Sequence, residues 1–471
     1  MRRALPKFRL KVPNTYILIF SLLVIFVVLT WIIPGGEYQR MELKGREVVV
    51  PGSFKYTQSN PQGLFDLFTA PIRGFVDGAL IIGFILLVGG SFNVLQKTEA
   101  IDKFIHRITQ AYHKSKLLKV MILPILITLF SLAGATFGMN EEIIPFIIVF
   151  VPLALALGYD SIIGVAIPLV GAHIGFASAF LNPFNVGIAQ GISEVPLFSG
   201  IEYRLAVWFI VNLTVIIFIV RYANKIRKNP EKSPVYALDR ERRESMHLDN
   251  VSDNESIVFT TRHKIVLYAF LLSLLAIVVG VIYFQWFIEE IAAVFFVMGI
   301  ATGLIGGLKG EGIVKGFIEG AKDLVGTAFI LALARATVVI AQDGLIIDTI
   351  LYKLAPLVES SNPVFASQKM FVIQAVINFF IHSGSGQAAL TMPIMAPLSD
   401  LVGVSRQTAI LAFQFGELTN IIIPTSAVTM GALSMGKIPY EKWAIWVLPL
   451  TIILAVVALI LLIPPFLINW Q

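Results

Sequence analysis

Seven apolar runs, each close in length to a bilayer-spanning helix, constrain the fold of this chain more than any other feature. A helix needs about 20 apolar residues to cross the hydrocarbon core of a membrane. Only 14% of the residues are charged, whereas soluble domains carry about 25%. We therefore predict an all-α polytopic membrane protein that spans the lipid bilayer at residues 16–34, 76–95, 205–220, 265–284, 291–308, 325–341 and 443–467.

The distribution of basic residues sets the expected orientation. Arg2, Arg3, Lys7, Arg9 and Lys11 precede the first run, and positive charge favours the cytoplasmic side of a membrane. We expect the N-terminus in the cytoplasm of a bacterial cell, the protein in the inner membrane, and the polar segment 35–62 outside. The net charge of +6 then reflects topology, so no nucleic-acid partner is expected. Without cysteine, the chain has neither disulfides nor thiolate metal sites.

The chain is expected to divide into two membrane halves. The first half comprises residues 1–222 and the second residues 287–471. A charged stretch at 223–262 reads as a solvated cytoplasmic linker, with a regulatory domain as the alternative, and residues 263–286 form a linking span. Residues 74–79 (Gly-Phe-Val-Asp-Gly-Ala) match residues 316–321 (Gly-Phe-Ile-Glu-Gly-Ala) in type. Because the linking span reverses the starting side, we predict two inverted repeats, a design of secondary transporters.

Polar, glycine-rich clusters interrupt the apolar stretches at matched places in both halves. Residues 134–142 and 382–387 predict the tips of re-entrant hairpins at about 117–157 and 370–402. Asn182-Pro183 and the stretch 416–426 predict breaks in the helices that follow, at about 160–190 and 405–435. Exposed backbone at membrane depth is tolerated where it lines a polar cavity. We therefore expect the tips and breaks to form one site.

The side chains at these tips and breaks are the predicted substrate-binding residues. Ionisable groups at membrane depth are costly and mark functional positions. The predicted set is Asn140, Glu141, Glu142, Asn182, Asn185, Ser383, Ser385, Gln387, Glu417, Asn420 and Thr425. No cofactor is expected apart from a coupling ion, Na⁺ or H⁺, and a Na⁺ would lie near Gly138, Asn182, Gly386 and Asn420. Arg335 either binds an anion or pairs internally, and His173 and His382 are either proton relays or packing residues.

Several of these motifs carry a family resemblance. Residues 31–38 (Trp-Ile-Ile-Pro-Gly-Gly-Glu-Tyr), with the tip at Asn140 and the stretches 182–184 and 417–420, resemble the YfcC group of the DcuC-type C4-dicarboxylate carriers, within the ion transporter superfamily. The resemblance implies an elevator-type transporter, a homodimer, and coupling to Na⁺ or H⁺. Some relatives are regarded as arginine/ornithine exchangers.

Three functions stay open from the sequence alone. Surplus carboxylates at the tips favour a transporter of a cationic amino acid, of the arginine/ornithine-exchange type. Arg335 and the hydroxyl-rich second tip leave a Na⁺- or H⁺-coupled C4-dicarboxylate or other organic-anion carrier as the alternative. An intramembrane hydrolase is the remote third, because residues 382–386 lack the leading glycine of a nucleophile elbow. The chain also lacks a phosphate-binding loop motif, and we expect no enzyme activity.

Overall fold

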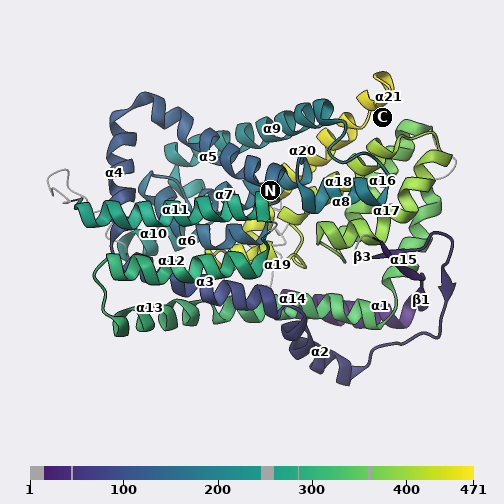
Figure 1. The fold of residues 1–471 in the computed structure, drawn as a ribbon, viewed down its shortest axis with the longest axis horizontal. Coiled ribbons are helices and arrows are strands. Elements are labelled where there is room, and N and C mark those ends of the chain that lie inside the picture. Colours follow the sequence, from purple (N-terminus) through teal and green to yellow (C-terminus); the bar gives the residue numbers. More distant parts are fainter. Residues whose placement is uncertain (1–14, 44–45, 246–258, 285, 359–361, 471) are drawn as a thin grey trace, which may run out of the picture.

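A computed structural model describes residues 15–43, 46–245, 259–284, 286–358 and 362–470 (Figure 1). In these residues, seven helices are long and apolar enough to cross a membrane. Six of them coincide with expected spans: α3 (Ala79–Lys97), α9 (Ile201–Lys228), α11 (Thr261–Phe284), α12 (Ile288–Ile305), α14 (Val325–Asp343) and α20 (Tyr440–Leu461). The seventh is α5 (Lys116–Phe137), which was expected to be a short hairpin limb. The basic arm used to orient the N-terminus lies outside the described residues, so that orientation stays a prediction.

The expectation of an all-α chain is wrong in the polar segment that follows α1 (Thr15–Ile32). Its described residues form four short strands, β1 (Gly36–Glu37), β2 (Arg40–Leu43), β3 (Arg46–Val49) and β4 (Lys55–Tyr56). β1 pairs with β4 and β2 with β3, each pair antiparallel. The β-branched Val48 and Val49 are buried, and such residues suit a partly buried pleated surface. β3 packs against α17 (Gly384–Leu401).

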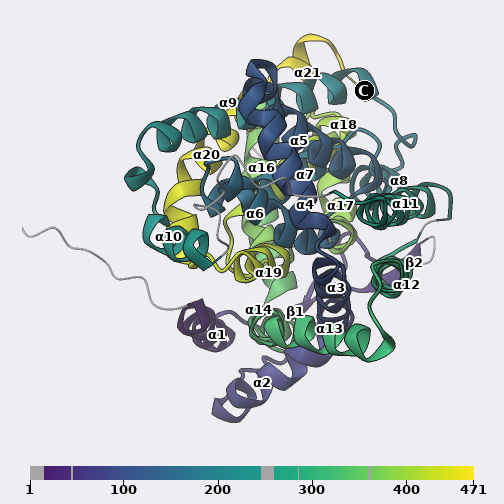
Figure 2. The ribbon, with the colours of Figure 1, turned by 90° about the vertical axis from the view of Figure 1, so that its left-hand side faces the viewer.

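Two long helical segments run antiparallel through the molecule. Each consists of a 14-residue helix followed, after one intervening residue, by a 19-residue helix: α2 (Leu64–Asp77) with α3, and α13 (Gly310–Asp323) with α14. α2 packs against α14, and α13 packs against α3. α1 also packs against α14, and α12 also packs against α3. Figure 2 shows α1, α2, α13 and α14 along the lower side of the molecule.

Small residues allow this close antiparallel contact, as is common between membrane helices. A Cβ added at Gly74 would lie 2.2 Å from the backbone oxygen of Ala332, and one at Gly320 would lie 2.4 Å from that of Gly89. Gly74 and Gly320 occupy the same position, three residues before the end of their helices. The sequence match paired Gly74 with Gly316, which lies four residues, or about one helical turn, before Gly320.

The remaining helices form two similar series. In the first half they are α4 (Ala100–Lys114), α5, η1 (Glu141–Phe146), α6 (Ile147–Ala156), α7 (Ser161–Ala177), η2 (Pro183–Gly187), α8 (Ile188–Ile192) and α9. In the second half they are α15 (Ile347–Leu354), η5 (Ala355–Val358), α16 (Pro363–Asn378), α17, α18 (Arg406–Gly416), η6 (Glu417–Ile421), α19 (Ala427–Met435), α20 and α21 (Pro464–Leu467). α5 and α6 pack on α7, and α16 and α17 pack on α18.

The linker between the halves was expected to be solvated, but its described part is docked. α9 extends to Lys228, and η3 (Pro230–Lys232) and α10 (Tyr236–Ser245) follow it. Val235 and Asp239 are buried against the body of the protein. Most of its other charged residues, such as Glu231, Lys232 and Arg240, are exposed, so this part of the linker is anchored to the membrane domain through a few contacts. Residues 246–258 of the expected linker lie outside the described part of the chain.

Candidate functional site

Asn182 joins the predicted first tip, residues 134–142, to the break that follows α7. Its Nδ2 donates to the backbone oxygen of Gly134 at 3.1 Å, and its Oδ1 accepts from the backbone N–H of Phe184 at 2.8 Å. Gly138, at the tip, has a φ of +79°, and a Cβ there would lie 2.7 Å from Asn182 Oδ1. Both the left-handed backbone and this close approach require glycine. The tip at Gly138 is therefore in direct contact with the break at Asn182.

The second hairpin meets the second break through a similar set of contacts. Asn378, the last residue of α16, donates through Nδ2 to Thr419 Oγ1 at 2.8 Å and to Asn420 Oδ1 at 3.0 Å. Thr425 Oγ1 donates to the backbone oxygen of Phe379 at 2.8 Å. Ser426 then accepts from the backbone N–H of Thr429 and begins α19. Each broken helix is thus bonded to the predicted hairpin segment of its own half.

The side chains of Asn185 and Glu417 bridge the two breaks. Asn185 Nδ2 donates to Glu417 Oε2 at 3.2 Å and to the backbone oxygen of Phe176 at 3.1 Å. Glu417 is 1% exposed, and a Cβ added at Gly384 would lie 2.8 Å from its Oε1. The Asn185–Glu417 pair therefore lies where both breaks meet the second hairpin tip.

Four buried oxygen atoms in this region have no hydrogen-bond partner among the described residues. They are Asn185 Oδ1, Asn378 Oδ1, Gln387 Oε1 and Glu417 Oε1. All four are acceptors. A buried acceptor without a donor costs about 1–3 kcal/mol, and such groups in native proteins call for a ligand, ion or water. The chemistry that satisfies them is a cation or an N–H or O–H donor.

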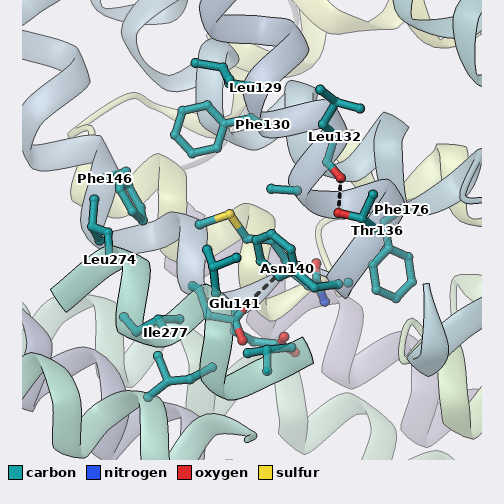
Figure 3. A pocket seen from close by; sticks show the side chains of 18 of the residues that line it. Leu129, Phe130, Leu132, Thr136, Asn140, Glu141, Phe146, Phe176, Leu274 and Ile277 are labelled. Atoms are coloured by element: carbon teal, nitrogen blue, oxygen red, sulfur yellow. Dashed lines mark hydrogen bonds between the residues drawn. The ribbon is translucent and has the colours of Figure 1, made fainter. Parts of the chain in front are cut away.

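A large cavity opens beside the first tip, and we call it the apolar cavity. It has a volume of about 930 Å³, and most of its wall is aliphatic and aromatic. Figure 3 shows Asn140 and Glu141 near the centre of the cavity wall, with Phe130, Phe146, Leu274 and Ile277 also on the wall. Glu142 Oε2 accepts from the backbone N–H of Asn140 at 2.8 Å. The polar end of this cavity is formed by residues of both tips, Asn140, Glu141, Glu142, Ser383 and Ser385.

A second cavity, of about 460 Å³, lies on the strand side of the second tip, and we call it the charged cavity. Six acidic or basic side chains line it: Glu37, Arg40, Glu47, Asp77, Arg335 and Asp348. Arg335 Nε lies 3.1 Å from Asp77 Oδ2, so internal pairing, one of the two roles left open for Arg335, is present. Ser383 lines both cavities.

The structure distributes the predicted site residues over three environments. Asn140, Glu141, Glu142, Ser383 and Ser385 line the apolar cavity. Asn182, Asn185, Glu417, Asn420 and Thr425 are buried where hairpins meet breaks. Gln387 points into the second hairpin, where its Nε2 donates to Gln374 Oε1 at 2.8 Å, and it lines neither cavity. His173 Nδ1 contacts the backbone oxygen of Leu169 at 2.9 Å, which fits a packing histidine.

Sequence reasoning missed Arg204, in the first turn of α9. It is fully buried and has no carboxylate partner among the described residues. Its guanidinium donates to Gln414 Oε1 and to Gln407 Oε1, the latter at 2.8 Å, and lies 5.2 Å from the ring centroid of Trp470. A lone arginine opening an apolar span was the available signal, since such residues mark functional or anchoring positions.

Comparisons with known proteins agree with a membrane carrier. The sequence model of the DcuC family, described as C4-dicarboxylate anaerobic carrier, matches residues 12–466. YfcC of Escherichia coli (strain K12), provisionally named a basic amino acid antiporter, is 36% identical, with 93% of each chain covered. An uncharacterized protein of Haemophilus influenzae is 28% identical, with 96% of each chain covered.

Two solved transporters are distantly similar. The Alcanivorax borkumensis YdaH transporter is 14% identical, with a TM-score of 0.42 and coverage of 97% of this chain and 99% of its own. Neisseria gonorrhoeae MtrF, from a class of antimetabolite efflux pumps, is 17% identical, with a TM-score of 0.44 and coverage of 96% and 95%.

Proposed function

Because the chain belongs to the DcuC family, described as C4-dicarboxylate anaerobic carriers, we propose that it is a secondary active transporter that exchanges cationic amino acids. We infer this substrate class from the place where Asn185 contacts Glu417, which we call the Asn185–Glu417 junction. It holds one carboxylate and unpartnered acceptor oxygens, and no described residue forms an ion pair with Glu417. A substrate ammonium or guanidinium would supply both the charge and the donors that these atoms lack.

The two glutamates of the first tip support the same substrate class. Glu141 and Glu142 line the apolar cavity, and neither forms an ion pair among the described residues. Two neighbouring carboxylates in a low-dielectric region repel one another, and a cation between them relieves that repulsion. A dicarboxylate would increase it. The name given to the E. coli relative, a basic amino acid antiporter, points the same way.

We propose an elevator mechanism built on two inverted repeats. The matched helix lengths, 14 and 19 residues in both halves, support the repeat. The exchange of partners supports it too, because α2 packs on α14 while α13 packs on α3. In this proposal the long antiparallel pairs form a fixed scaffold. The two hairpins and broken helices, bonded to one another through Asn182, Asn185 and Asn378, move as one unit. The homodimer stays a prediction.

An organic-anion carrier remains the second candidate, and one observation favours it. Arg335 and His382 lie together on the wall of the charged cavity, where an arginine side chain suits a carboxylate. The description of the family also names dicarboxylates. The carboxylates at the two tips and at Glu417 weigh against this candidate.

Exchange in liposomes separates the two functions. The purified full-length protein is reconstituted into liposomes loaded with unlabelled ornithine, and uptake of labelled arginine is measured with and without external Na⁺. We expect arginine to accumulate only in ornithine-loaded liposomes. Matched liposomes loaded with succinate serve as the control, with labelled succinate outside. Succinate exchange without arginine exchange would overturn the cationic substrate and favour the dicarboxylate.

A further inference from the structure

The charged cavity has the size of a ligand site in its own right. Its volume of about 460 Å³ lies within the usual range for small-molecule sites, roughly 300–1,000 Å³. Strands β1 to β3 close one side, and α14, α15 and the second hairpin tip close the others. It is separate from the Asn185–Glu417 junction, because neither of those residues lines it.

The charges on its wall do not balance. Arg40 Nη2 contacts Asp348 Oδ2 at 3.0 Å, and Arg335 pairs with Asp77. Both arginines are therefore already neutralised. Glu37 and Glu47 also line the cavity and form no ion pair among the described residues. Two carboxylates are left over, so the cavity favours a solute with excess positive charge.

The end of the cavity formed by Arg335 and His382 has hydrogen-bond donors that are free to bind a ligand. Asp77 contacts Arg335 at its Nε, whereas a guanidinium carries five N–H donors. His382 lies on the same wall, and both of its ring nitrogens are buried without a hydrogen-bond partner among the described residues. An unpaired buried imidazole is costly unless something binds it. A carboxylate placed at this end would accept from Arg335 and His382.

We infer that the charged cavity, between Glu37 and Glu47 at one end and Arg335 and His382 at the other, is a second binding site for a cationic amino acid. The α-carboxylate lies toward Arg335 and His382, and the side-chain cation lies toward the two glutamates. This inference rests on the proposed function and adds a recruitment site to it. Since Ser383 lines both cavities, a solute held here is separated from the apolar cavity by the tip of the second hairpin.

The number of bound ligands tests this inference. Equilibrium binding of labelled arginine to the full-length protein in lipid nanodiscs should give two sites per chain. The double variant Glu37→Gln/Glu47→Gln should lose one site or weaken it at least tenfold, while Glu417→Gln should lose the other. Two exposed glutamates outside both cavities give a control of equal charge, Glu289→Gln/Glu311→Gln, which should keep both sites.

Agmatine, which is arginine without its carboxylate, tests the other end in the unaltered protein. It should bind the charged cavity at least tenfold more weakly than arginine does. A single arginine site that Glu417→Gln removes and Glu37→Gln/Glu47→Gln leaves unchanged would overturn this inference and leave the proposed function intact. An absence of any arginine binding would overturn both.

Discussion

Asp239 accepts a hydrogen bond from the backbone N–H of Ser161, at 2.8 Å from Oδ2, and so ties the linker between the halves to the first residue of α7. Two neighbouring arginines extend this contact. Arg243 Nη2 donates to the backbone oxygen of Tyr159 at 2.7 Å, and Arg242 Nη2 donates to that of Lys437, after α19, at 2.6 Å. α10 is thus bonded to both broken helices at their ends, and we expect it to move with them.

Removing the Asp239 carboxylate should release the linker. Asp239→Ala leaves the Ser161 N–H without its acceptor, and losing a buried hydrogen bond to a charged group costs about 1.5–3 kcal/mol. We expect faster hydrogen–deuterium exchange across residues 229–245 and a lower melting temperature. Asp323→Ala, at an exposed position at the end of α13, is the control. Unchanged exchange in Asp239→Ala would show that the linker is held by other contacts.

Acidification should raise the free energy of unfolding through Asp160, the residue before α7. Burial raises the pKa of Asp160 to about 6, although Tyr222, Ser233 and the backbone N–H of Ile163 all donate to it. In the unfolded chain the pKa is about 3.9, so between about pH 4 and 6 the folded protein binds the proton more tightly. The free energy of unfolding therefore falls as the pH rises through 6. The difference is about 3 kcal/mol at 1.36 kcal/mol per pKa unit.

Melting curves at about pH 5 and 7.5 measure this effect. The unaltered protein should melt at the higher temperature at the lower pH, and Asp160→Asn should lose that difference because it cannot ionise. Burial also raises the pKa of Asp239, which should likewise make the melting temperature higher at the lower pH. A melting temperature that rises with pH over this range would contradict the assignment.

Glu417→Gln should abolish exchange without unfolding the protein. A glutamine side chain keeps an oxygen that can accept from Asn185 Nδ2 but loses the charge that the substrate cation requires. Because a buried neutral group costs less than a buried charge, the melting temperature should stay the same or rise. We expect arginine–ornithine exchange to fall at least tenfold, while Glu202→Gln, an exposed residue of α9, exchanges normally. Normal exchange by Glu417→Gln would remove this residue from the site.

The sequence predicted those parts of the molecule that depend on local pattern. All seven expected spans are helices in the structure, and six of them are long and apolar enough to cross a membrane. The resemblance to the DcuC family is confirmed. The helix ends near Gly138, Gly384 and Pro183 could be located because glycine and proline disrupt helices in any tertiary context. Asn185 and Glu417 were chosen as polar residues at breaks, and the structure joins them.

Features that depend on distant partners could not be predicted. Glu417 and Asn185 are 232 residues apart, and nothing local indicates that their side chains meet. Gln387 looked like a tip residue, but the carbonyl and side chain of Gln374 hold it inside the hairpin. Arg204 was overlooked because its partners, Gln407 and Gln414, belong to the other half. The contact between Asp239 and Ser161 could not be predicted either, because charge alone does not reveal a docking surface.

The antiparallel contact between α2 and α14 gives a prediction that needs no knowledge of the substrate. At Gly74, an added Cβ would lie 2.2 Å from the backbone oxygen of Ala332 and 2.5 Å from the backbone nitrogen of Ala336, so the two helices must separate. Overpacking of this kind costs about 1–3 kcal/mol. At Gly83, in α3, an added Cβ meets nothing within 4 Å, and alanine is the better helix former by about 1 kcal/mol. Gly74→Ala should therefore lower the melting temperature in detergent, and Gly83→Ala should leave it unchanged or raise it. If the two variants had the same melting temperature, the close approach of these helices would be disproved.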